Sequence, residues 1–546
     1  MLGLMMNRPL LISSILRHAD RCHGDAEIVS RTIEGPIHRC TYREAHVRAR
    51  KLARALTRLG VEPAQRVGTL AWNGYRHFEL YYAVSGIEAI IHTINPRLFF
   101  DQLTYIVDHA DDRLVFFDLT FLPLAEKLAP HCPRIAHWIA LTDRVHMPKS
   151  TTLANLLCYE DLVAAESDDF DWPEFDENTA AGLCYTSGTT GHPKGVLFSH
   201  RSTLLHAYAV SLPDSKGYSS HSVVLPIVPM FHVNAWGIPY AAALTGAKLV
   251  FPGAGMDAAS LFELFETEKV ESSAGVPTVW LGLIAHMKER CLKFSTLKAA
   301  TIGGAAVPAT MVRTLQDDFG LKVLHGWGMT EMSPVGTINT EKAKHESLPP
   351  KERFELSLKQ GRPLPGVEMK IVDAEGAELP WDGKAAGNLL VRGPWVLREY
   401  FRGEGGNPLS ADGWLPTGDV GTIDPDGYLQ ITDRSKDIIK SGGEWISSIE
   451  LENVAIGHPG VAEAAVIGVR HPRWSERPLL LVVRKPGASV DRDAILGFYE
   501  GKIAKWSTPD DVVFVDELPH TATGKLSKRT LREQYKDYRL PTAWST

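Results

Sequence analysis

The chain has 546 residues, of which 44% are hydrophobic and 23% charged, and its formal net charge is −7. These values are ordinary for a globular protein with enough length for roughly three to four domains, and they exclude disordered, collagen-like and coiled-coil chains. The negative charge gives no general attraction for a nucleic-acid backbone, so we expect no nucleic-acid partner. Any polyanion that binds would need a local cluster of donors.

The cysteines and the apolar segments indicate where the protein resides. Six cysteines occur without any Cys-x-x-Cys spacing, so we expect neither a zinc site nor disulfides, and a reducing compartment. The apolar stretch 235–251 is interrupted by Pro239, Gly246 and Lys248 before it could span a membrane. The short apolar run at 10–16 lacks a signal-peptide cleavage pattern and has helical spacing, which predicts the first helix. We therefore expect a cytoplasmic protein without stable membrane insertion.

Up to about residue 435, short apolar runs alternate with amphipathic segments. Runs of four to six apolar residues that end at Gly or Pro are typical of buried strands, and the segments between them are typical of crossover helices. This alternation predicts a layered α/β fold with largely parallel sheets. The expected strands lie at 67–71, 113–117, 181–186, 223–228, 248–251 and 299–302.

Two later segments have a different composition. Residues 387–434 contain short strand patterns separated by Gly, Pro and Asp, which predicts a β-subdomain or a small β-barrel. Residues 341–359 are rich in Lys and Glu, which is typical of a solvated loop or helix face.

After residue 436 the pattern indicates a small α+β domain of about a hundred residues. We expect helices at 446–456 and 491–504, and strands at 464–469, 479–483 and 512–515. The chain is thus expected to divide into a large N-terminal domain, residues 1–435 with a β-subdomain at about 361–435, and a C-terminal domain, residues 436–546.

The segment 185–195 reads Tyr-Thr-Ser-Gly-Thr-Thr-Gly-His-Pro-Lys-Gly and follows an expected strand. Glycines allow backbone N–H groups to close around an anion, hydroxyl groups add donors, and Lys194 adds positive charge. Lys194 is followed by Gly195 and not by Ser or Thr, so this is not a Walker A loop. The segment is favoured as a phosphate-binding loop over a simple turn. Its candidate nucleotide ligands are Thr186, Ser187, Gly188, Thr189, Thr190, Gly191 and Lys194.

This loop resembles the phosphate-binding loop of the adenylate-forming superfamily, which includes acyl-CoA synthetases, peptide-synthetase adenylation domains and firefly-type luciferases. Six further motifs of that family follow in the same order across nearly the whole chain, at 229–236, 303–304, 326–331, 417–419, 433–450 and 518–528. The resemblance implies a large domain that binds ATP and the acid, a small mobile C-terminal domain, and the use of ATP, Mg²⁺ and coenzyme A.

The three motifs of the large domain imply an acid pocket beside a nucleotide site. Pro-Met-Phe-His-Val-Asn-Ala-Trp at 229–236 resembles the motif whose histidine and aromatic residue line the acyl pocket. Gly-Trp-Gly-Met-Thr-Glu at 326–331 resembles the motif that stacks an aromatic ring on adenine, with Trp327 where many relatives have Tyr. The implied acid pocket is His232, Trp236, Gly303, Gly328 and Pro334. The implied nucleotide contacts are Gly303, Gly304, Gly326, Trp327 and Thr330, with Thr186 and Glu331 at Mg²⁺.

The remaining motifs imply how the two domains cooperate. Thr417-Gly-Asp419 resembles the acidic ribose-binding motif, since one carboxylate can accept hydrogen bonds from two sugar hydroxyls. The segment 433–450 resembles the interdomain hinge, with Arg434 near ribose and phosphate and Lys436 as the hinge itself. Lys440, Gly442, Gly443, Glu444 and Trp445 would border the coenzyme A tunnel. Lys525 matches the mobile catalytic lysine, and with His232 and Glu331 it completes the implied catalytic set.

The resemblance implies that a carboxylic acid is first joined to the α-phosphate of ATP and then transferred to the thiol of coenzyme A. The Trp-containing motifs at 236, 327 and 445 resemble the medium- and long-chain fatty-acid branch. Over its whole length the chain looks most like the bacterial ligases for 3-methylmercaptopropionate, a short thioether acid made from dimethylsulfoniopropionate. A medium- or long-chain fatty-acid ligase, an enzyme that loads a carrier protein and a luciferase-type enzyme are the alternatives. By analogy with the family, we expect a homodimer.

Overall fold

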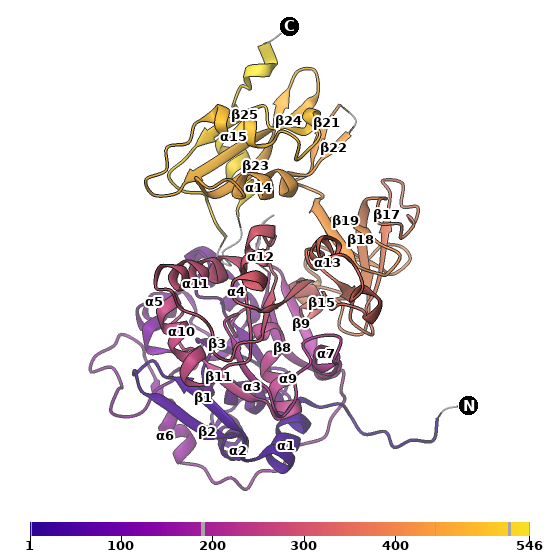
Figure 1. Ribbon diagram of the computed structural model, residues 1–546. Helices are drawn as coiled ribbons and strands as arrows, with labels where there is room; N and C mark the ends of the chain where they lie inside the picture. The colour runs from indigo at the N-terminus through magenta and orange to yellow at the C-terminus, as the bar shows by residue number, and fades with distance from the viewer. Residues whose placement is uncertain (2, 187–191, 443, 522–525, 545–546) are drawn as a thin grey trace.

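The computed structural model describes residues 1, 3–186, 192–442, 444–521 and 526–544. Within these ranges the chain forms four β-sheets. Figure 1 shows the two largest sheets and their helices as one body that carries the N-terminus, with the C-terminal part standing apart on top of it and the β17–β19 region to its side. The layered α/β fold expected from the sequence is confirmed.

The first large sheet has the strand order β7-β6-β5-β3-β4-β8-β9. All of its neighbouring pairs are parallel except β8 and β9, which run antiparallel. The pair β8–β9 therefore forms a hairpin, and Thr186 and Lys194, at the two ends of the candidate phosphate-binding loop, adjoin its strands. The strands are β3 (Arg66–Leu70), β4 (Ile90–Thr93), β5 (Asp112–Phe117), β6 (His137–Ala140), β7 (Leu156–Cys158), β8 (Ala180–Tyr185) and β9 (Gly195–Ser199).

The second large sheet has the order β16-β15-β14-β13-β12-β10-β11-β1-β2. Its inner strands are parallel, and its two edges are closed by antiparallel pairs. The strands are β1 (Glu27–Arg31), β2 (Ile37–Thr41), β10 (Val223–Pro226), β11 (Lys248–Phe251), β12 (Ser272–Gly275), β13 (Ala299–Ile302), β14 (Lys322–Gly328), β15 (Val335–Ile338) and β16 (Arg362–Pro363).

A shared core holds the two large sheets together. Every residue of helix α3 (Tyr75–Gly86) is buried, and the core around it contains side chains from strands of both sheets. A helix that is covered all round cannot be amphipathic, which explains its weak polar periodicity. Helices α1 (Ile12–His23), α2 (Tyr42–Arg58), α7 (His200–Ser211) and α9 (Ile238–Thr245) contribute to the same core.

Two further cores lie on the outer faces of these sheets. Helices α10 (Ala258–Thr267), α11 (Pro277–Glu289) and α12 (Ala309–Asp317) cover one sheet, and α4 (Phe100–Ala110) and α5 (Leu122–Leu128) cover the other. Covering both faces is what makes the parallel strands continuously apolar in sequence. The shorter helices are α6 (Tyr159–Ala164), α8 (Val233–Trp236) and α13 (Pro350–Ser357).

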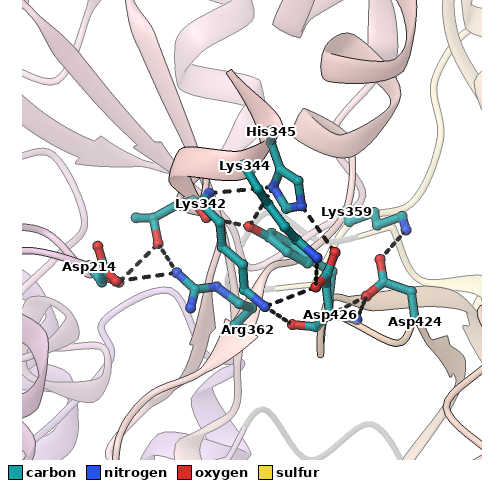
Figure 2. A network of polar contacts seen from close by, with 10 residues as sticks. Asp214, Lys342, Lys344, His345, Lys359, Arg362, Asp424 and Asp426 are labelled. Carbon is teal, nitrogen blue, oxygen red and sulfur yellow. Dashed lines mark hydrogen bonds and ion pairs between the residues drawn. The ribbon is translucent and has the colours of Figure 1, made fainter. Parts of the chain in front are cut away.

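A four-stranded antiparallel sheet, β17-β18-β19-β20, follows the large sheets. Its strands are β17 (Glu368–Val372), β18 (Gly387–Arg392), β19 (Leu415–Ile423) and β20 (Leu429–Arg434). The charged segment 341–359 is largely exposed, as expected of a solvated loop and helix face, and ion pairs also attach it to this sheet. Figure 2 shows Lys342, Lys344 and His345 converging on Asp426, and Lys359 reaching Asp424. These donors, Lys344 foremost, lower the pKa of the Asp426 carboxyl.

The C-terminal sheet has the order β22-β21-β24-β23, with β25 paired to β24. The strands are β21 (Ile439–Ser441), β22 (Glu444–Ile446), β23 (Val461–His471), β24 (Ser475–Arg484) and β25 (Asp511–Phe514), and the helices are α14 (Ser448–Ile456), α15 (Arg492–Phe498) and α16 (Lys528–Gln534). The helix expected at 491–504 is shorter than predicted. It ends at Phe498, and Gly501 then takes a φ of +72°, which a continuing right-handed helix does not allow.

No helix in the described part of the chain is both long and apolar enough to cross a membrane.

Candidate active site

The ends of the candidate phosphate-binding loop are fastened to each other. The backbone N–H of Thr186 donates to the carbonyl of Lys194 at 2.9 Å, and the backbone N–H of Lys194 donates to the Thr186 hydroxyl at 3.1 Å. These bonds continue the β8–β9 ladder beyond the pair Tyr185 and Gly195. Ser187, Gly188, Thr189, Thr190 and Gly191 lie outside the described residues.

Tyr400 connects the loop lysine with the candidate metal ligand. The Lys194 ammonium lies 4.7 Å from the centre of the Tyr400 ring, a distance at which a cation is attracted to an aromatic face. The Tyr400 hydroxyl donates a hydrogen bond of 2.8 Å to Oε1 of Glu331. Burial, together with the adjacent Glu331 carboxylate, raises the pKa of Tyr400, so the phenol remains a donor.

The glycines of the two central motifs allow their backbones to approach one another. A Cβ atom on Gly303 would lie 2.5 Å from the carbonyl oxygen of Gly326, and one on Gly328 would lie 1.9 Å from that of Pro334. Neither position can therefore hold a side chain without moving the backbone. These contacts place the end of β13 against β14 and the segment that follows β14.

Trp327 is oriented by a carboxylate from the neighbouring sheet. Its indole N–H donates to Oδ2 of Asp419 at 2.8 Å, and Arg434 donates to Oδ1 of the same carboxylate at 2.7 Å. Asp419 and Arg434 are direct partners across β19 and β20. The aromatic, the acid and the arginine of three separate motifs thus form one contiguous group.

The motif at 229–236 ends in a left-handed turn. Val233, Asn234, Ala235 and Trp236 have φ values between 44° and 55°, and each non-glycine residue in this region costs about 1–2 kcal/mol. Such strain persists only where surrounding contacts impose it, and it is common at functional sites. One of these contacts is from Lys216, whose ammonium donates to the Trp236 carbonyl at 3.2 Å.

A single cavity of about 240 Å³ joins these features. Its lining combines apolar side chains, Trp236, Val335 and Ile338, with polar groups at the ends of the loop and in the 326–331 motif. Of the site residues expected from the sequence, the cavity is lined by Thr186, Lys194, His232, Trp236, Gly303, Gly304, Gly326, Trp327, Gly328, Thr330, Glu331, Pro334 and Arg434.

Of the residues expected to serve coenzyme A, those that the structure describes do not line this cavity. Lys440, Glu444 and Trp445 lie on the exposed β21–β22 hairpin, where Gly442 packs against Trp474. Lys436 lies in an exposed turn after β20. Gly443 and the expected catalytic Lys525 lie outside the described residues.

The cavity also contains residues that the sequence did not indicate, among them Lys216, Thr301 and Tyr400. Lys216 is 8% exposed, and burial lowers the pKa of its amine to about 7. Its surroundings in sequence, Pro-Asp-Ser-Lys-Gly-Tyr, are those of a surface turn. No local sequence signal distinguishes this buried lysine from an exposed one, because elements far away in the chain bury it.

Comparison with known proteins identifies the family. The model of the AMP-binding enzyme family matches residues 16–401, and that of its C-terminal domain matches residues 450–525. The chain belongs to the AMP-binding enzyme family, as the seven motifs indicated.

Individual relatives cover nearly the whole chain. A 3-methylmercaptopropionyl-CoA ligase of Ruegeria lacuscaerulensis is 53% identical, with 98% of this chain and 99% of the relative covered. A medium-chain-fatty-acid–CoA ligase of Ectopseudomonas oleovorans is 49% identical over the full length of both. Among solved structures, an anthranilate CoA ligase in complex with anthranoyl-AMP has a TM-score of 0.84 at 25% identity, with 98% of each chain covered.

Proposed function

We propose that this enzyme is an AMP-forming acyl-CoA ligase for short or medium apolar acids, with 3-methylmercaptopropionate as its preferred substrate. The observation that carries the proposal is the shared cavity, which is lined by Trp236, Trp327 and Arg434 together, with Asp419 bonded to the last two. An acid and a nucleotide could therefore bind side by side in one continuous cavity.

The first step would join the acid to the α-phosphate of ATP, with release of pyrophosphate. Two anions must approach each other, so positioning and fixed positive charge are the main needs. Lys194 and Arg434 bring such charge to the cavity, and the sequence assigns a further charge to Lys525. The Trp327 ring, held by Asp419, would stack on the adenine.

Glu331 and Thr186 suit a magnesium ion that is shared with substrate phosphates. Magnesium usually takes only one or two carboxylates from the protein and completes its shell with phosphate and water. Glu331 is 8% exposed and lines the cavity, and Tyr400 bonds only one oxygen of its carboxylate among the contacts of the described residues. When bound, the ion would offset phosphate charge; the protein's part is to hold the Glu331 carboxylate toward the cavity.

The second step would transfer the acyl group to the thiol of coenzyme A, with release of AMP. The β21–β22 hairpin lies away from the cavity, so we propose that the C-terminal domain rotates about Lys436 to present Lys440, Gly442, Gly443, Glu444 and Trp445. A rotation of this kind changes the backbone angles of only a few hinge residues. A cytoplasmic location and a homodimer remain predictions.

The deciding experiment is acid-dependent pyrophosphate exchange, with and without coenzyme A, over acetate, butyrate, 3-methylmercaptopropionate, hexanoate, octanoate and palmitate. We expect the highest rate on 3-methylmercaptopropionate, and AMP release that coenzyme A completes. A maximum at octanoate or palmitate would assign the enzyme to fatty acids of that length. Exchange that coenzyme A cannot turn over would favour loading of a carrier protein, and no exchange would refute the proposal.

A further inference from the structure

Two buried polar groups in the cavity have donor or acceptor capacity that the protein leaves unused. The Lys216 ammonium has three N–H donors, of which one is taken by the Trp236 carbonyl, and the nitrogen also lies 6.0 Å from the centre of the Tyr218 ring. Burial is the sole cause of its lowered pKa, and no neighbouring carboxylate acts to raise that pKa. The Thr301 hydroxyl is buried, at 1% exposure of the residue, and has no hydrogen-bond partner among the described residues.

Both groups belong to the part of the cavity around Trp236. Thr301 on β13 is paired in register with Ala274 and Leu324, whose side chains belong to the same core as Trp236. A Cβ on Gly303 would lie 3.6 Å from the Trp236 indole. Lys216 reaches the same residue through its carbonyl, and both Lys216 and Thr301 line the cavity.

An unpaired buried polar group is costly, and the cost is recovered when a ligand supplies the missing partner. Burial lowers the pKa of the Lys216 amine to about 7, so a share of the amine is uncharged near neutral pH, and an uncharged amine is matched by a neutral hydrogen-bond acceptor.

We propose that Lys216 and Thr301 form a polar subsite for the tail of the acid, which selects short acids with a hydrogen-bond-accepting heteroatom, such as a thioether sulfur or an ether oxygen, over all-carbon acids of the same length. The inference rests on the proposed function and adds to it the two residues that set the class of acid.

The test compares three acids of equal length, 3-methylmercaptopropionate, 3-methoxypropanoate and pentanoate, by kcat/KM for acyl-CoA formation. Lys216→Met keeps the side-chain length and removes the donors, and Thr301→Val keeps the shape and removes the hydroxyl. We expect the kcat/KM for 3-methoxypropanoate, divided by that for pentanoate, to fall on the order of tenfold in Lys216→Met, as the loss of one hydrogen bond predicts. The fall should be smaller in Thr301→Val. Lys298→Met, at an exposed lysine just before β13, should leave the ratio unchanged.

The subsite is overturned if both variants keep the wild-type ratio. It is also overturned if Lys216→Met alters only the preference between butanoate and hexanoate, because Lys216 would then merely support the Trp236 turn. A higher rate on succinate than on 3-methoxypropanoate would likewise overturn it, since Lys216 would then act as a cation for a second carboxylate.

A different experimental result would show that the proposed function itself is wrong. If the wild type makes no acyl-CoA from any of the three acids, the proposed function as a short-acid ligase fails. The subsite is then decided by thermal shift, in which 3-methoxypropanoate should raise the Tm of the wild type more than pentanoate does, and that difference should vanish in Thr301→Val. Thr301→Val also serves as the deciding variant if Lys216→Met does not fold.

Discussion

The indole N–H of Trp327 donates a hydrogen bond of 2.8 Å to the carboxylate of Asp419, although the two residues are 92 positions apart. The indole ring also packs on Gly336, where a Cβ would lie 2.8 Å from it. The hydrogen bond to Asp419 fixes the orientation of the ring. The absence of a side chain at Gly336 allows the ring to pack against the backbone there. The tryptophan at this position is thus held as a fixed surface in the cavity.

Trp327→Phe should weaken the binding of ATP more than it slows the chemical step. The change keeps an aromatic face but removes the donor to Asp419, and a hydrogen bond to a charged group contributes roughly 1.5–3 kcal/mol. We expect the KM for ATP to rise roughly tenfold in acid-dependent pyrophosphate exchange. Trp381→Phe, at a tryptophan that is 39% exposed and away from the cavity, is the matched control. An unchanged KM for ATP would remove Trp327 from the nucleotide site.

Lys525→Ala should abolish adenylate formation while ATP still binds. Losing one fixed positive donor at a developing charge typically lowers the rate on the order of 10²–10³. The measurement is acid-dependent pyrophosphate exchange, with ATP binding followed separately by calorimetry. Lys536→Ala, at an exposed lysine of the same domain, should behave as the wild type. Full exchange in Lys525→Ala would refute its catalytic assignment.

Lys436→Pro should separate the two half-reactions. Proline fixes φ near −65° and so restricts the turn after β20 in which Lys436 lies. We expect pyrophosphate exchange to persist and acyl-CoA formation to stop, because only the second step requires rotation of the C-terminal domain. Lys436→Ala, which keeps a free φ, is the control and should retain both steps. Equal loss of both steps in the proline variant would contradict the hinge.

Lys216 should make the stability of the enzyme depend on pH above neutrality. Burial lowers the pKa of its amine to about 7 in the folded protein, whereas an unfolded lysine has a pKa of about 10.4. Between these values the unfolded chain binds more protons, so the stability of the folded state rises with pH. The penalty is complete below pH about 7 and is lost toward pH about 10.4.

The same linkage predicts a pH-dependent difference in Tm between Lys216→Met and the wild type. Lys216→Met should raise the Tm most near pH 6, and this gain relative to the wild type should shrink as the pH approaches 10. The loss of the hydrogen bond to the Trp236 carbonyl shifts the Tm of Lys216→Met by an amount that does not change with pH. The test is therefore how the difference in Tm between variant and wild type changes with pH. Lys298→Met, which alters an exposed lysine, should show no such trend. A gain that is constant across this range would show that Lys216 does not titrate as described.

The sequence by itself determined the family, the order of the motifs and most of the strands, because these signals are local. Apolar runs such as 248–251 and 299–302 coincide with β11 and β13, since a strand buried on both faces must be continuously apolar. The Gly-rich loop and the 326–331 motif are recognisable because close backbone approach excludes other residues, as the contact of Gly328 with Pro334 illustrates.

Only the tertiary structure decided which polar residues are buried, and against what. Lys216 has the sequence context of a surface turn, yet it lies beneath the left-handed turn at Trp236. Tyr400 belongs to no recognised motif, yet it links Lys194 with Glu331. Lys342 resembles a solvated charge, but its partly buried ammonium meets Asp426, 84 residues later in the chain. Each of these contacts joins distant elements, and the burial that gives the contact its energetic weight arises only when the sheets and the β17–β20 unit have packed together.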